Sequence, residues 1–107
     1  MADRAMKLSE AIEAKLEQSA GLVVYSDLAA HLGRDAVFVV ARSLSLVACG
    51  VAVATDDVER VEGWVQSGEL RKPSRAERAA WPNDAGRRWL AVVVQPFVLV
   101  QDPAAAT

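Results

Sequence analysis

The run of apolar residues from Trp89 to Gln101 dominates the hydrophobic pattern of this chain. It reads WLAVVVQPFVLVQ, and almost every position is apolar. Successive side chains of a β-strand point to opposite faces of a sheet, so strands of this composition need cover on both faces. Gln95 and Pro96 interrupt the run, because proline has no N–H to give to a sheet ladder. The pattern predicts either two strands joined by a two-residue hairpin, with a cis bond before Pro96, or one kinked strand.

The first part of the chain has the spacing of helices around a short strand. Apolar residues recur every four positions from Leu8 to Leu16 between charged ones, which predicts an amphipathic helix over residues 7–19. An extended Val23 and Val24 should follow, and then a helix of about two turns that Ser26 and Asp27 begin and Gly33 ends. The β-branched and aromatic run from Ala36 to Ala41 predicts a strand.

Two later segments have the spacing of a helix start. Asp56 with Glu59, and Ser74 with Glu77, are each three residues apart, which is the spacing of a capping box. The second of these helices should be short and should end at Trp81, because a proline follows. For the first helix, the spacing predicts one inward-facing apolar side made of Val58, Val61, Trp64 and Val65.

Length and composition indicate one globular domain over residues 1–107, with residues 103–107 as a loose C-terminal tail. The chain is 52% hydrophobic and 24% charged, which is typical of a folded protein. Its net charge is −2, made of −4 in residues 1–68 and +2 in residues 69–107. An acidic total argues against a dedicated nucleic-acid binder, although a local basic segment remains available for contacts.

The sequence favours a cytoplasmic protein that does not enter a membrane. Cys49 is the sole cysteine, so no intrachain disulfide can form. The first ten residues, MADRAMKLSE, lack the apolar core of a signal peptide. The longest charge-free runs have 13 residues, fewer than the roughly 20 that span a bilayer.

No group of residues forms a catalytic or metal-binding motif. His31 is the lone histidine, with no partner at metal-ligand spacing, and no GxSxG motif marks a nucleophilic serine. Asp56 and Asp57 are adjacent carboxylates, but their place at a helix start explains them without a metal. We therefore expect no catalytic residue, no metal and no cofactor, and favour a protein that is not an enzyme.

The basic segment from Arg71 to Arg88 is the one candidate ligand site. It holds six of the twelve Lys and Arg residues, with tryptophans between them. Arginine beside an aromatic ring is suited to phosphates and to stacked bases, although a solvated surface explains the same charges. Trp81, at a helix end, is the tryptophan best placed for partial exposure. The candidate ligand-binding residues are Arg71, Lys72, Arg75, Arg78 and Trp81.

The segment from Leu44 to Ala54 suits a strand or a helix on periodicity alone. Around it, the chain contains LSLV, then DDxxRVxxWVxxGELRKPS, and finally WLAVVVxPFVLVQ. This pattern resembles an uncharacterised bacterial family catalogued as domain of unknown function 2288. The resemblance implies a helix from Leu44 to Ala54 and implies no activity. The chain departs from the family at Phe97 and Tyr25, where tryptophan is usual, and at Ser45, where aspartate is common.

Together these features predict an α+β fold with a small, mostly antiparallel sheet of about three strands and about five short helices. The strands are expected at residues 36–41, 89–94 and 97–101. Helices on both faces, or helices on one face and a second subunit on the other, would cover them. Because so small a chain has few helices to spare, we expect a homo-oligomer, most simply a dimer, that acts as a protein-interaction module. Binding of a small molecule, a phosphate or nucleic acid through the basic segment is the alternative.

Overall fold

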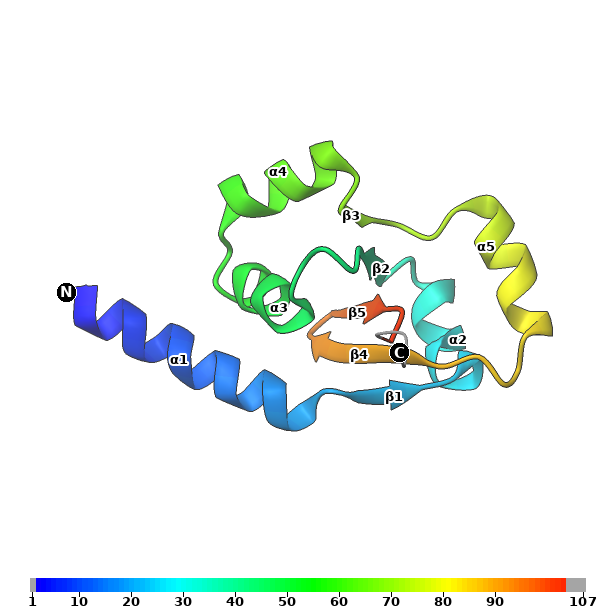
Figure 1. Ribbon diagram of the computed structural model, residues 1–107, viewed down its shortest axis with the longest axis horizontal. Helices are drawn as coiled ribbons and strands as arrows, with labels where there is room; N and C mark the ends of the chain where they lie inside the picture. Colours follow the sequence, from blue (N-terminus) through cyan, green and yellow to red (C-terminus); the bar gives the residue numbers. More distant parts are fainter. Residues whose placement is uncertain (1, 104–107) are drawn as a thin grey trace.

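A mixed five-stranded sheet forms the centre of the molecule (Figure 1). The computed structural model describes residues 2–103, with side chains from residue 7 onward. The strand order is β1-β4-β5-β2-β3, in which β2 and β5 are parallel and the other neighbours are antiparallel. The strands are β1 (Gly21–Val23), β2 (Val37–Val40), β3 (Leu70–Arg71), β4 (Trp89–Val94) and β5 (Phe97–Gln101).

Helices cover both faces of this sheet. Buried side chains of α1 and α3 share one hydrophobic cluster with the sheet, and α4 packs against the edge of that cluster. Buried side chains of α2 and of the short 3₁₀ turn η1 share a second cluster on the other face. The helical elements are α1 (Ala2–Ser19), α2 (Tyr25–Gly33), α3 (Leu46–Ala54), α4 (Val58–Ser67), α5 (Arg75–Ala80) and η1 (Trp81–Asn83).

The hairpin formed by β4 and β5 divides its side chains between the two clusters. Trp89 and Val98 belong to the cluster under α2 and η1, whereas Val92 and Leu99 belong to the cluster under α1 and α3. All four are at most 3% exposed. The expectation that this segment needs cover on both faces is therefore confirmed. Helices of the same chain cover both faces. A second subunit was the other source of cover that the sequence left open.

The hairpin alternative for the apolar run is correct. Val94 pairs with Phe97, and the two residues between them form the turn with a cis peptide bond before Pro96. At the other end of β5, the Gln101 side-chain amide donates hydrogen bonds of 2.8 Å to the Ala41 carbonyl and 2.7 Å to the Leu44 carbonyl. This amide fixes the loop that leads from β2 into α3.

The α+β class and the mostly antiparallel sheet are confirmed, but the expected number of about three strands is wrong. The additional strands, β1 and β3, have three and two residues and lie at the sheet edges, too short to show a period-2 pattern. The first helix begins at Ala2 rather than at residue 7. Of the expected tail, Pro103 alone is described, and its carbonyl accepts a hydrogen bond from Arg42.

The helix starts differ in one detail from the expected capping. Asp57, not Asp56, is the N-cap of α4 and accepts a hydrogen bond from the backbone N–H of Arg60, while Asp56 adopts a left-handed conformation with φ of 56°. The capping box of Ser74 and Glu77 is present as expected at the start of α5. The segment implied to be helical by the family resemblance is α3.

Gly50 is a point of close approach between α3 and its neighbours, and it gives a stability prediction. An added Cβ there would lie 2.8 Å from Leu16 Cδ1, a buried side chain, and 3.5 Å from methyl groups of Val92 and Val94. We expect Gly50→Val to lower the free energy of unfolding by about 1–3 kcal/mol through overpacking, measured by urea denaturation.

A glycine in an open position is the matched control. Gly63 lies within α4, and nothing stands within 4 Å of a Cβ placed there. Gly63→Ala should raise stability by about 0.5–1 kcal/mol, because alanine loses less backbone entropy than glycine on entering a helix. Equal stabilities for Gly50→Val and the unchanged protein would contradict the close packing of α3 against α1.

Candidate functional site

The apolar side of α4 is the feature that departs most from its expected burial. The sequence predicts that Val58, Val61, Trp64 and Val65 all face inward. Val61 and Trp64 do pack against the core, but Val58 and Val65 are 52% and 53% exposed. None of the ten residues of α4, all of them described, is fully buried. The helix therefore covers the core only in part, and some of its apolar side chains are in contact with solvent.

An open hollow lies between α4 and the sheet. Its volume is about 150 Å³, which is enough for a benzene-sized group. The rings of Phe38 and Phe97 meet edge to face within it, with centroids 5.5 Å apart and an interplanar angle of 80°. Every residue that lines the hollow is apolar: Phe38, Val53, Val61, Val65, Leu70, Phe97 and Leu99.

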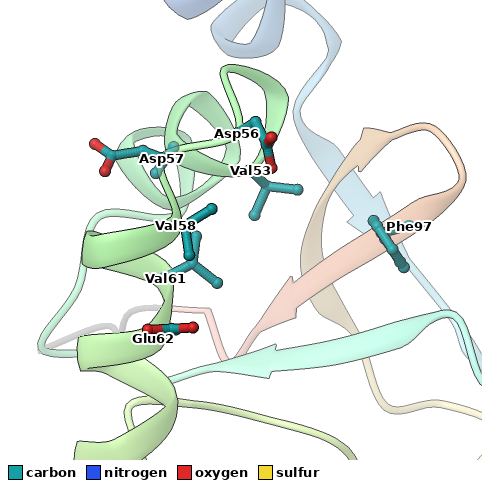
Figure 2. Close-up of a pocket in the computed structure, with 8 residues that line it drawn as sticks. Val53, Asp56, Asp57, Val58, Val61, Glu62 and Phe97 are labelled. Atoms are coloured by element: carbon teal, nitrogen blue, oxygen red, sulfur yellow. The ribbon is translucent and has the colours of Figure 1, made fainter.

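A second hollow of about 230 Å³ continues the first toward the start of α4. The two share Val53, Val61 and Phe97, and Figure 2 shows Val58 and Val61 pointing from α4 toward the side on which Phe97 stands. We call the two hollows together the α4 groove. Among the described residues that line it, three are acidic and none is Lys or Arg. The acidic ones are Asp56, Asp57 and Glu62.

The carboxylates of this rim do not all point the same way. In Figure 2 the Asp56 carboxylate lies beside Val53, whereas that of Asp57 points away from Phe97, consistent with its role as the cap of α4. Glu62 lies on α4 next to Val61 and is exposed. Asp56 and Glu62 are therefore the two rim carboxylates that are free of the helix cap.

Turns at both ends hold α4 in place over the groove. Before the helix, the backbone N–H of Asp57 donates to the Ala52 carbonyl across 2.9 Å. After it, Gly68 adopts φ of 84°, a left-handed conformation that favours glycine, and the Glu69 N–H donates to the Trp64 carbonyl across 2.9 Å. Local backbone geometry thus fixes both ends of α4, while Val61 and Trp64 contact the core between them.

The basic segment singled out from the sequence is largely engaged in ion pairs. Arg71 contacts Glu77 at 2.6 Å, while Lys72 and Arg78 both contact Asp35, at 2.6 and 2.7 Å. Within the described residues, no carboxylate pairs with the fourth candidate cation, the exposed Arg75. The pair of Arg71 with Glu77 joins β3 to α5, and the two contacts with Asp35 tie α5 and the residue Lys72 before it to the end of α2, so three of the four cations have a structural role.

The expectation that Trp81 is partly exposed is wrong. Trp81 is 2% exposed, because η1 folds its indole onto the sheet against Trp89, with ring centroids 4.8 Å apart. The guanidinium of Arg87 lies 4.9 Å from the Trp89 centroid and pairs with Asp102 at 2.8 Å. The two aromatic rings therefore serve the core and offer no open surface on which a base could stack.

The other residues considered from the sequence have structural surroundings. Cys49 is fully buried, and this burial raises the pKa of its thiol to about 11, so the thiol stays protonated at neutral pH. His31 is half-buried, with Nδ1 2.6 Å from the Arg34 guanidinium. Within the side chains that the structure describes, no three His, Cys, Asp or Glu residues gather in the way metal ligands do.

Fold and groove define a small α+β domain with a mixed sheet, helices on both faces and an apolar groove beside α4. Residues 11–102 match the family described as "Protein of unknown function (DUF2288)", and the chain belongs to this family, as its motifs indicated.

The chain is similar to the NMR solution structure of PA1075 from Pseudomonas aeruginosa. The two share 31% sequence identity with a TM-score of 0.74, over 91% of this chain and 90% of that one. No curated protein matches the chain. Across residues 2–103, none of the helices combines the length and apolar character needed to cross a membrane.

The ion pair of Glu77 gives a pH prediction. Hydrogen bonds from Arg71, together with those from Ser74, hold the pKa of the Glu77 carboxyl at about 2, below its ordinary 4.5. Because the folded pKa is the lower one, the stabilisation is complete above pH 4.5 and is lost as the pH falls toward 2. Solvent screens the half-exposed Arg71, so we expect a loss of no more than ~1 kcal/mol.

Glu77→Gln isolates this charge, because glutamine keeps the acceptor of the capping box. Unfolding measured between about pH 5 and about pH 2.5 should show a smaller loss of stability in Glu77→Gln than in the unchanged protein. Glu10→Gln, at an exposed carboxylate on α1, should follow the unchanged protein. Parallel curves for all three proteins would show that the pair with Arg71 contributes nothing.

Proposed function

We propose that this domain is a non-enzymatic protein-interaction module and that the α4 groove is its binding surface. One observation carries the proposal: Val58 and Val65, on the apolar side of α4, are more than half exposed, and each lines one of two adjoining hollows, of which the narrower has a wholly apolar lining. Clustered exposed apolar side chains of this kind are typical of sites where another protein docks.

The openness of the groove favours a protein side chain over a small molecule as its occupant. Small-molecule sites usually enclose most of the ligand's surface, in a cavity of about 300–1,000 Å³. The two hollows of about 230 and about 150 Å³ together reach only the lower part of this range, and both are open to solvent. A cavity of this size suits one bulky apolar side chain, the kind of anchor that supplies most of the affinity at protein interfaces.

Self-association stays a prediction of the sequence. The original reason for it is weaker, because helices of the same chain cover both faces of the sheet. Light scattering at tens of micromolar protein tests it directly, and a strict monomer would exclude a stable homodimer. A cytoplasmic location likewise stays a prediction.

The alternative of an anionic ligand at the basic segment has less support. Of its candidate residues, Arg71, Lys72 and Arg78 are paired with carboxylates, and Trp81 is buried. Tryptophan fluorescence with a panel of nucleotides and oligonucleotides tests it, since binding of this type should weaken steeply with salt.

Photo-crosslinking tests the groove in the organism that makes the protein. A photoreactive phenylalanine analogue replaces Val65 in one strain and Leu8 in another. Leu8 is 60% exposed on α1, so the two positions are matched in accessibility and differ in location. We expect an adduct of defined mass from position 65 that position 8 does not give. No adduct from position 65, or the same adducts from both positions, would refute the groove as a binding surface.

A further inference from the structure

The α4 groove is acidic at one end, which indicates the chemistry of its partner. Resting on the proposed function, we propose that the groove binds a segment of another protein that carries a bulky apolar side chain flanked by Lys or Arg. The apolar side chain enters the hollow beside Phe38 and Phe97, and the cations meet the carboxylates of the rim.

The charge of the rim is one-sided. Asp56 and Glu62 border the wider hollow, and among the described lining residues no Lys or Arg offsets them. The cation nearest in sequence, Arg60, lies over the ring of Trp64 at 5.1 Å from its centroid and does not line the groove. A ligand segment that places Asp or Glu at the rim would meet like charge, while Lys or Arg there gains attraction and a faster encounter.

The same charge argues against a second copy as the occupant. A two-fold dimer through this surface would place each groove against its own copy, because both subunits contribute the same patch. Asp56 and Glu62 of one copy would then face the groove of the other, whose described lining contains no Lys or Arg to pair with them. The groove therefore lacks, in its own lining, the cations that would complement its acidic end, and this favours a different chain as the occupant.

The apolar end of the groove predicts which apolar residues the bound segment carries. The narrower hollow, with its wholly apolar lining, accepts a group about the size of a benzene ring. Val58 and Val65, exposed on the apolar side of α4, are available to neighbouring apolar positions of the bound segment. A leucine, isoleucine, methionine or phenylalanine with at least one cation nearby in sequence satisfies both ends.

Selection from a displayed random peptide library against the full chain tests the proposal. The affinities of enriched peptides are then measured by fluorescence anisotropy. We expect peptides rich in large apolar residues and in Lys or Arg, with binding that weakens as salt rises.

Val65→Asp should weaken binding of the selected peptides by about tenfold or more. Leu8→Asp, which also replaces an aliphatic side chain of similar exposure on a helix, but outside the groove, should leave affinity unchanged.

A double variant separates charge from shape. Asp56→Asn removes one carboxylate while asparagine tolerates the left-handed backbone at that position, and Glu62→Gln removes the other from an exposed helical site. The double variant should weaken the selected peptides by about threefold to tenfold and flatten their salt dependence. Glu10→Gln, on α1, is the charge control. If Val65→Asp fails to fold by urea denaturation, Val65→Ser replaces it.

The peptide selection distinguishes failure of the proposed partner chemistry from failure of the proposed function. Peptides that depend on Val65 but are neutral or acidic, or that ignore the double variant, overturn the partner chemistry and leave the proposed function standing. A selection in which no peptide depends on Val65 overturns both. A concentration-dependent dimer in sedimentation that Val65→Asp dissociates also overturns this inference, because the occupant would then be a second copy.

Discussion

Burial of the β4–β5 hairpin on both faces is the constraint on which the rest of the structure depends. Its strands carry large apolar side chains at adjacent positions, and every adjacent pair faces in opposite directions. One layer of helices can cover only one of these faces. The chain therefore places α1 and α3 on one side and α2 with η1 on the other, each contributing buried side chains to its own cluster. Since those helices cover the two faces of the hairpin, α4 is the helix that covers the sheet near β3.

The basic segment follows from the same constraint. The tilted packing of Trp81 against Trp89 requires that α5 and η1 be held against the sheet, and the polar contacts around Asp35 do this from outside the core. Asp35 follows α2 in a left-handed conformation, and Lys72 and Arg78 both reach its carboxylate. Cations that resemble a ligand site in the sequence thus connect two elements that are far apart along the chain.

The periodicity of the sequence was sufficient to predict the elements that depend on residues close together in the chain. The need for cover on both faces of the last apolar run, the capping box at Ser74 and most helices could be predicted, because pattern and caps act within a few residues. The choice between a hairpin and one kinked strand stayed open. The edge strands β1 and β3 could not, since two or three residues form a strand only through their partners in the sheet. The burial of Trp81 and the pairing of Asp35 with Lys72 depend on contacts across the fold, which neighbouring residues do not encode.

The α4 groove exists because of a mismatch between side-chain length and the distance that α4 has to bridge. Capping by Asp57 and the left-handed Gly68 fix the ends of the helix. The apolar residues of α4 that line the groove are valines, whose branched side chains are short and have few rotamers. Opposite them stand Phe38 and Phe97, which are only half-buried. Neither wall can collapse onto the other, so apolar surface that could have stabilised the fold stays in contact with solvent, where a partner's side chain gains by covering it.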